Sequence, residues 1–267
     1  MPAKKPSIGA SIGAALRCAA SPKRVVPFFA VNLVYLLMIV ALFDSLSALI
    51  VAASTHTLTG GLIVQFVPAF AAAVLVVVVM FFVSLYFKAG LMDNAGNFWR
   101  KKEVKFSQSL RSIRPMYLSF VGSAILAGVI SGIFSLIPIV GALISLVLSW
   151  LFFLTIPSVI LGKKDAVGSL QESYHIFMKE KWQTFLMWLS VVVLVVLLAL
   201  VALIPLAVFG LPAILAIRAV GVIAAIRANM GLLVIGGIIS SYLLAYMTVF
   251  SESAKAFYYV QVKKVGR

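Results

Sequence analysis

The polar side chains that could carry chemistry within the apolar part of this chain are Asp44, Asn32, Gln65 and Arg218. Ionisable and amide groups are costly in hydrocarbon, so those inside a membrane span often mark an ion pair or a substrate site. Asp44 and Gln65 fall at similar depths on consecutive apolar segments and could share one pocket, with Arg218 or Arg227 as the cation. Alternatively, Asp44 marks the outer interface, roughly 28 Å along a helix that begins near Val25.

A second group of candidate residues is a run of cations in "NFWRKKEVKFSQSLRSIRP", residues 97–115. These cations are Arg100, Lys101, Lys102, Lys105, Arg111 and Arg114. Phe106, Leu110, Ile113 and Tyr117 recur at spacings of four, three and four, which is one face of a helix. A basic amphipathic helix of this kind is typical of a segment on a membrane surface, with its apolar side in the acyl boundary and its cations at the headgroups. We therefore expect residues 104–114 to lie on the inner leaflet and these cations to contact anionic lipid.

Metal-protease, P-loop and dithiol motifs are absent from the sequence. It contains no HExxH, Walker A or CxxC pattern. Cys18 is the only cysteine, which excludes an intrachain disulfide and a thiolate metal cluster. We expect no enzyme activity, no metal and no cofactor.

The composition indicates an integral membrane protein. Of the 267 residues, 63% are hydrophobic and 11% charged, and the mean hydropathy is +1.16. The apolar residues form runs of about 20, the length that crosses a hydrocarbon layer of about 30 Å as a helix. A net charge of +15 would suggest nucleic acid in a soluble protein. In a multi-pass chain the excess of cations instead marks the loops that stay in the cytoplasm. We therefore expect no nucleic-acid partner.

Six membrane spans fit the sequence, at about 25–52, 62–87, 116–137, 139–161, 183–209 and 230–250. Twenty of the 22 Lys and Arg residues then fall on one side, in the N-terminal segment, in loops 88–115 and 162–182, and in the tail. Cations collect in cytoplasmic loops. We expect a protein of the plasma (inner) membrane with both termini in the cytoplasm.

Segment 211–229, "LPAILAIRAVGVIAAIRAN", permits a different topology. It could be a seventh span, a surface helix or a re-entrant segment. A central arginine costs about 2.5–3.5 kcal/mol on the insertion scale, which favours the surface or re-entrant segment. Pro212 suits a new helix that begins there.

The expected fold class is an all-α polytopic membrane bundle of three helical hairpins, each preceded by an interfacial amphipathic helix. One integral membrane domain, 1–267, would then contain units at about 7–87, 104–161 and 165–250. In the third unit Asp165 is a suitable N-cap. Residues Ala124, Gly128 and Gly132 on the third span, and Gly237, Ser241 and Ala245 on the sixth, are spaced for close helix packing.

Two segments resemble a known family: "YFKAGLMDNAGNFWRKKEVKFSQSLRSI" and "IPSVILGKKDAVGSLQESYHIFMKEKWQTF". They are similar to prokaryotic six-span membrane proteins of unknown function. This group includes YciC-like proteins and the membrane domain beside some glycerophosphoryl diester phosphodiesterases. The matching residues are Pro157, Asp165, Ser169, Leu170, Ser173 and Trp182. The resemblance covers roughly residues 80–200 and implies fold and topology but no activity.

The function we expect from the sequence is non-enzymatic: membrane organisation, or binding of a lipid or a protein partner through a basic cytoplasmic face. The expected partners are an anionic inner leaflet and a membrane protein or a second copy of the chain. The alternative is a permease or channel for a small solute or lipid. A transporter should enclose a cavity with several convergent polar groups, and the first, second and sixth spans are where it would lie.

Overall fold

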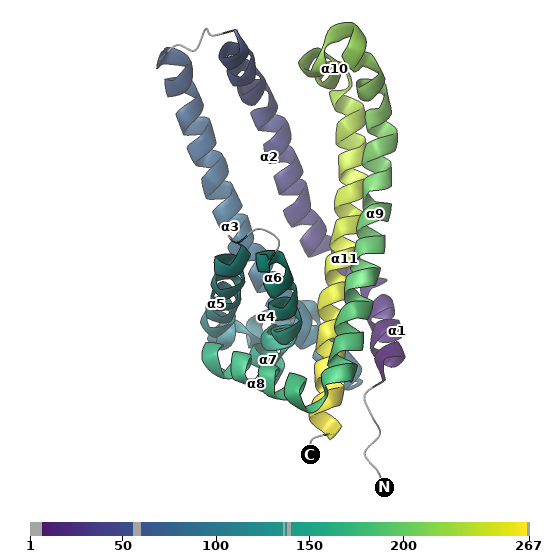
Figure 1. Ribbon diagram of the computed structural model, residues 1–267. Coiled ribbons are helices and arrows are strands. Elements are labelled where there is room, and N and C mark those ends of the chain that lie inside the picture. The colour runs from purple at the N-terminus through teal and green to yellow at the C-terminus, as the bar shows by residue number, and fades with distance from the viewer. Residues whose placement is uncertain (1–6, 56–59, 136, 138–139, 266–267) are drawn as a thin grey trace. The chain divides into compact units, whose positions relative to one another are not determined.

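The computed structural model describes residues 7–55, 60–135, 137 and 140–265, and within them the regular structure is helical with no strand (Figure 1). The helices are α1 (Ile8–Ala19), α2 (Pro22–Ser54), α3 (Gly60–Trp99), α4 (Phe106–Ser112), a 3-10 turn η1 (Arg114–Met116), α5 (Tyr117–Ser135), α6 (Val140–Leu151), α7 (Thr155–Gly162), α8 (Ala166–Lys179), α9 (Lys181–Val220), α10 (Val222–Ala228) and α11 (Met230–Val265).

The predicted fold class is confirmed, because the described residues contain six helical segments long and apolar enough to cross a membrane. They are Pro22–Ala53, Phe66–Trp99, Arg114–Phe134, Leu143–Gly162, Lys181–Val220 and Met230–Lys263. The fourth contains a break, since α6 ends at Leu151 and α7 starts at Thr155. The chain is an all-α, multi-pass membrane protein.

Three helices continue well past the predicted spans. Helices α3 and α9 have 40 residues each and α11 has 36. A helix of 40 residues is about 60 Å long, roughly twice the hydrocarbon thickness. Residues 88–99 of the expected loop 88–115, and residues 251–265 of the expected tail, are therefore helical.

The prediction of a new helix at Pro212 is wrong. Pro205 and Pro212 both lie inside α9, which continues to Val220. The helix ends at Gly221, whose φ of 81° lies in the left-handed region that favours glycine. Helix α10, with seven residues, is far shorter than the about 20 that a span needs.

The chain divides into two compact units, and four of the long helices contribute to both. Unit 1 comprises Met1–Val25, Leu85–Val196 and Tyr246–Arg267; unit 2 comprises Val26–Ser84 and Leu197–Ala245. Whether the sequence also forms three repeats of an amphipathic helix and a hairpin stays a prediction.

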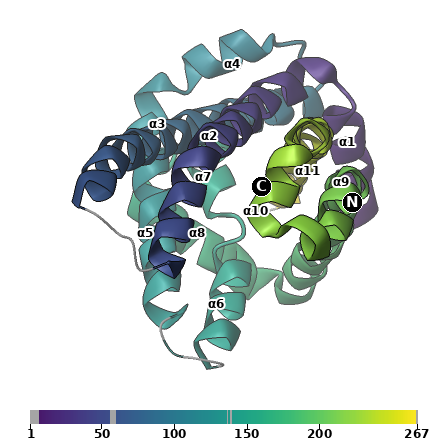
Figure 2. The ribbon, with the colours of Figure 1, turned by 90° about the horizontal axis from the view of Figure 1, so that it is seen from above.

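In unit 1, the core forms around the C-terminal part of α11. Phe250, Phe257, Tyr258 and Tyr259 are almost fully buried there, as is Phe120 of α5. Helices α5 and α6 lie side by side, and α8 packs against α5 and α7 (Figures 1 and 2). A helix that is apolar on every side belongs in a core, which explains why "AFYYV" is buried.

In unit 2, α9 and α11 run side by side and α10 joins them (Figure 1). Many large apolar side chains of α2, α3 and α9 are exposed, for example Val64, Leu75 and Leu203. Exposed apolar surface on this scale is unusual in a soluble domain, and it is what helices surrounded by lipid require.

The small residues predicted for helix packing divide into two kinds. A Cβ added at Gly237 would lie 2.7 Å from Leu36 Cδ1, so α2 and α11 approach closely there, as predicted. At Gly128 and Gly132 an added Cβ would meet no atom within 4 Å. The expectation of close packing is therefore wrong for these two glycines of α5.

Replacing Gly236 by alanine should destabilise the pair of helices α9 and α11. The new Cβ would lie 2.9 Å from the Pro205 carbonyl oxygen and 3.2 Å from Leu206 Cα. Backbone atoms cannot move aside as a side chain can, so we expect a loss of about 1–3 kcal/mol in unfolding free energy. Gly231→Ala, also on α11 but with open space at Cβ, is the control. Equal melting temperatures for the two variants in one detergent would contradict the predicted contact.

The three amphipathic segments are helical where the sequence predicts them, as α1, α4 and α8. Asp165 caps α8, because its Oδ1 accepts from the Gly168 N–H at 3.2 Å. The apolar side of α4 contacts α3: the Tyr86 hydroxyl donates to the Leu110 carbonyl at 2.6 Å, and the Leu110 side chain fills the space beside Gly90. Ile113 is fully buried. The apolar side of α4 thus packs partly on the protein, where a contact with acyl chains was expected, and Lys105 and Arg111 are exposed.

Helix α1 contacts the C-terminal part of α11 through Ser11 and Cys18. The buried residues of α1 are Ser11, Ala14, Ala15, Cys18 and Ala19. The Ser253 hydroxyl donates to Cys18 Sγ at 3.3 Å, and Gln261 Nε2 donates to the Ser11 hydroxyl at 2.6 Å. Burial raises the pKa of the Cys18 thiol, so this group stays protonated at neutral pH and packs as a small apolar side chain.

Candidate functional site

The cation that Asp44 meets is Arg227 of α10, whose Nη2 lies 2.7 Å from Asp44 Oδ1. Both side chains are exposed, Asp44 by 79% and Arg227 by 61%. Arg218, near the end of α9, is also exposed. An exposed ion pair contributes little, about 0–1 kcal/mol in water. The pair therefore joins α2 to α10 at the surface of unit 2.

Asn32, another candidate for a polar intramembrane site, has a partner other than Asp44. Asn32 Nδ2 donates to the Ser241 carbonyl at 3.0 Å, which ties α2 to α11. Asn32 and Asp44 are twelve residues apart on α2, about 18 Å along the helix. Gln65 lies in α3, but its side chain is outside the described residues. Asn32 and Asp44 thus bind different partners, at different levels of the helix.

The predicted cationic stretch, by contrast, lines a large cavity in unit 1. The cavity has a volume of about 910 Å³, and Lys101, Lys102 and Lys105 lie on it. Lys23 and Arg24, from the first turn of α2, complete a set of five cations. The other lining residues are Ser21, Asn94, Phe98, Glu103, Val104, Phe106 and Ser107. Arg100, Arg111 and Arg114 are exposed and are not among the residues that line this cavity.

Two chain reversals create this basic cavity. Helix α1 ends at Ala19 and α2 begins at Pro22, so Lys23 and Arg24 follow a tight turn. Helix α3 ends at Trp99, and Lys101 takes a left-handed backbone conformation, with φ of 57°. The Lys102 N–H then donates to the Asn97 carbonyl at 2.9 Å. The chain turns back at this point, and the segment from Lys102 to Lys105 leads into α4.

Arg24 is held in place by three neighbours. Its Nε donates to Asn94 Oδ1 at 2.8 Å, and its Nη1 donates to the Cys18 carbonyl at 3.4 Å. The guanidinium carbon lies 4.9 Å from the centre of the Phe98 ring, within the range of a cation–π contact. A guanidinium has five N–H donors, and these two bonds use two of them. The others remain available to an anion in the cavity.

Asn94 connects the two sides of the cavity. Its side chain is almost completely buried, at 3% exposure. Its Oδ1 accepts from Arg24, and its Nδ2 donates to the Val104 carbonyl at 2.8 Å. A buried amide with both ends bonded keeps Arg24 and the 101–105 segment in a fixed relation.

The electrostatics of the cavity favour an anion with several charges. Five cations face one carboxylate, Glu103, among its lining residues. A concave site lined by one sign of charge attracts the opposite sign strongly, and Arg and Lys are the usual ligands of phosphate. Sequence reasoning identified Lys101, Lys102 and Lys105 but missed Lys23, Arg24 and Asn94. The available signal was "SPKR", a pair of cations directly before the first span.

A separate buried polar cluster joins α8 to α11. The Tyr259 hydroxyl donates to Glu172 Oε1 at 3.0 Å, and the Lys263 ammonium forms an ion pair with the same oxygen. The Glu172 side chain is 10% exposed. Tyr259 and Lys263 both bind Glu172 Oε1, while Oε2 is buried without a hydrogen-bond partner among the described residues. Because the two bonds join α8 to α11, we assign the cluster a structural role.

We compared the chain with protein-family models, with curated proteins and with solved structures, and found no match in any of the three. The resemblance to the YciC-like group therefore stays a prediction. Fold and composition define the class: a multi-pass helical membrane protein with a basic cavity among its cationic loops.

Proposed function

We propose that this is a non-enzymatic membrane protein that binds anionic phospholipid headgroups in the basic cavity of unit 1. The observation that carries the proposal is the set of five cations around a concave site in which buried Asn94 fixes Arg24. A phosphodiester headgroup offers the oxygen acceptors that Arg and Lys bind best. The volume, about 910 Å³, lies within the range of about 300–1,000 Å³ for small-ligand sites.

The proposal includes an orientation in the membrane. The cavity lies beside the first turn of α2 and the last residues of α3. Nearly all cations of the chain are predicted on that same side, which supports cytoplasmic termini and an inner-membrane location. Anionic lipids of that leaflet would then reach the cavity laterally from the bilayer.

Binding is favoured over transport by the polar groups of unit 2. Asp44 and Arg227 form an exposed ion pair, and the Asn32 amide donates to the Ser241 carbonyl. Among the described residues, these polar groups do not line one common cavity. A permease needs convergent polar groups around its substrate. We therefore keep lipid binding as the proposed function, with a protein partner or a second copy of the chain as a further expectation.

The proposal is tested by removing three cations of the cavity together. The variant Lys101→Gln, Lys102→Gln, Lys105→Gln is purified, and native mass spectrometry compares its binding of phosphatidylglycerol and phosphatidylcholine. We expect its preference for phosphatidylglycerol to fall about 10- to 100-fold, since each cation near an anionic surface contributes about 1 kcal/mol.

The matched control is Arg100→Gln, Arg111→Gln, Arg114→Gln, which removes the same charge from exposed positions outside the cavity lining. This control should retain most of the preference. An equal loss in both variants would mean that net charge alone attracts the lipid, and the specific site would be rejected.

A further inference from the structure

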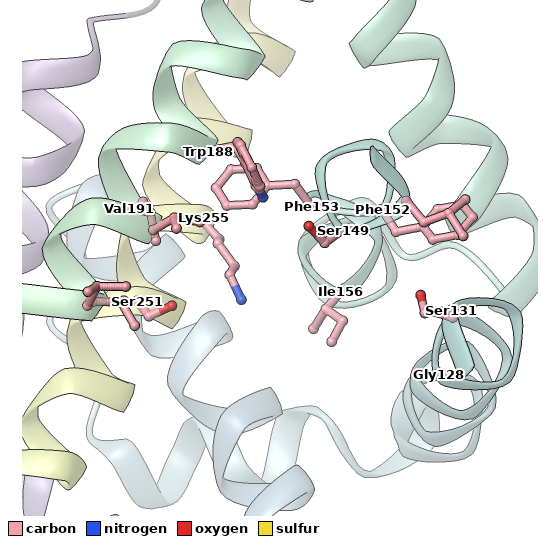
Figure 3. A pocket seen from close by; sticks show the side chains of 15 residues that line it. Gly128, Ser131, Ser149, Phe152, Phe153, Ile156, Trp188, Val191, Ser251 and Lys255 are labelled. Atoms are coloured by element: carbon pink, nitrogen blue, oxygen red, sulfur yellow. The ribbon is translucent and has the colours of Figure 1, made fainter. Parts of the chain in front are cut away.

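A second cavity in unit 1 lies beside the apolar faces of α5, α6 and α9. Its volume is about 460 Å³, within the usual range for bound small molecules. Most of the lining is apolar, and Lys255 is the one charged side chain among the lining residues (Figure 3). The hydroxyl-bearing residues on it are Ser131, Ser149 and Ser251.

We propose that this cavity holds one acyl chain of a membrane phospholipid, and that the ester carbonyl of this chain accepts a hydrogen bond from Lys255. This site is separate from the basic cavity and independent of the function proposed for it. The two differ in chemistry, since the first binds charged headgroups and the second an apolar chain.

The state of Lys255 favours an uncharged acceptor. Its Nζ lies 3.2 Å and 3.3 Å from the two carboxylate oxygens of Glu252. The two charges therefore compensate each other within the protein. Figure 3 shows the Lys255 ammonium directed into the open space between Ser251 and Ile156. An ammonium has three donors, and a neutral ester carbonyl accepts one of them without adding a negative charge beside Glu252.

The shape of the cavity matches a chain with its polar group at one end. The hydroxyls of Thr184 and Tyr258 lie 3.4 Å apart and fix the antiparallel register of α9 and α11. Lys255, one turn before Tyr258, is therefore level with Trp188, one turn after Thr184. From there the α9 lining continues through Val191 and Val192 to Val195 and Val196, about 12 Å along the helix. This part has room for methylene groups.

Gly128 of α5 keeps the cavity open. It lines the space, and a Cβ added there would meet no atom within 4 Å. A leucine at this position can therefore extend into the cavity without displacing the protein. Gly132, one turn further along α5, also has open space at Cβ but is not among the lining residues. The two glycines form a matched pair for a test.

Trp188 provides the reporter, since it lines the cavity and is only 7% exposed. A variant with Trp188 as its single tryptophan carries Trp99→Phe, Trp150→Phe and Trp182→Phe. It is reconstituted in vesicles of phosphatidylcholine with brominated acyl chains, which quench tryptophan fluorescence on contact. We expect strong quenching, and Gly128→Leu should reduce it about threefold because the leucine occupies the space of the chain. Gly132→Leu should leave it unchanged.

Quenching that is weak in the parent, or equal in both leucine variants, would overturn the proposal. A second comparison tests the ester: in detergent, brominated phosphatidylcholine should quench Trp188 at a lower concentration than a brominated fatty acid. The double variant Glu252→Gln, Lys255→Met should bind the phospholipid about tenfold more weakly, because it removes the charged donor without leaving an unpaired charge. Tighter binding of the free fatty acid would reject the ester carbonyl as the partner of Lys255. Because phosphatidylcholine is zwitterionic, failure here leaves the anionic-headgroup proposal unaffected.

Discussion

Replacing Glu172 by leucine is expected to destabilise unit 1 by about 2–4 kcal/mol. The Glu172 carboxylate accepts from the buried Tyr259 hydroxyl and pairs with Lys263, which joins α8 to the central helix α11. Leucine removes the acceptor and leaves the phenol without its partner in the interior, which costs more than the lost bond alone. The change is measured as the shift in thermal unfolding of the purified protein.

Two controls separate this effect from a general effect of leucine on α8. Gln171→Leu places the same residue at the adjacent, exposed position and should change stability little. Glu172→Gln keeps an oxygen for Tyr259 and loses the charge facing Lys263. We expect it to fall between the other two, because Lys263 is 46% exposed and water screens that pair. Equal melting temperatures for Gln171→Leu and Glu172→Leu would show that the cluster does not hold α8 on α11.

The spans were predictable because membrane insertion depends on a property that is local in sequence. A run of about 20 apolar residues is visible without knowledge of the fold, and each predicted span overlaps a helix of the structure. The helix ends were less predictable. Residues 88–99 were predicted as part of loop 88–115, but they belong to α3, in which residues 89–92 and 94–96 are buried.

Proline and glycine at the end of α9 illustrate a second limit. Pro212 was interpreted as the start of a helix because proline is favoured at the first helical position. A membrane helix also tolerates proline in its interior, and there α9 continues through Pro205 and Pro212. Gly221 carries the actual break. The sequence contains both residues and does not indicate which of them interrupts the helix.

Only the lining residues of the basic cavity that are close together in the sequence could be predicted. Lys101, Lys102 and Lys105 are close in sequence, so their shared location followed from spacing alone. Lys23 and Arg24 are about 80 residues away and join them only because α1 and α2 fold beside the end of α3. Asn94 lies within the predicted loop 88–115 and was not singled out, because its role depends on contacts with Arg24 and with Val104.

The substitution Asn94→Leu is expected to weaken anionic-lipid binding about tenfold without removing any charge. The prediction rests on the function proposed for the basic cavity. Without the amide, Arg24 Nε loses its acceptor and the Val104 carbonyl loses its donor. Arg24 and the 101–105 segment can then move independently, so fewer cations reach one headgroup in the required geometry. Native mass spectrometry with phosphatidylglycerol and phosphatidylcholine measures the preference, and thermal unfolding measures stability alongside it.

Asn97→Leu is the matched control, because Asn97 is also an amide near the end of α3 but bonds to Asp93 outside the cavity lining. A purely structural role for Asn94 would lower the melting temperature and leave the lipid preference intact. If Asn94 acts by positioning Arg24, the effects of Arg24→Gln and Asn94→Leu on lipid binding should not be additive, because each variant removes the same arrangement of the Arg24 guanidinium. If the fold loss of lipid preference in the double variant equalled the product of the two single losses, Asn94 would act independently of Arg24. The cavity would then be a cluster of charges without internal order.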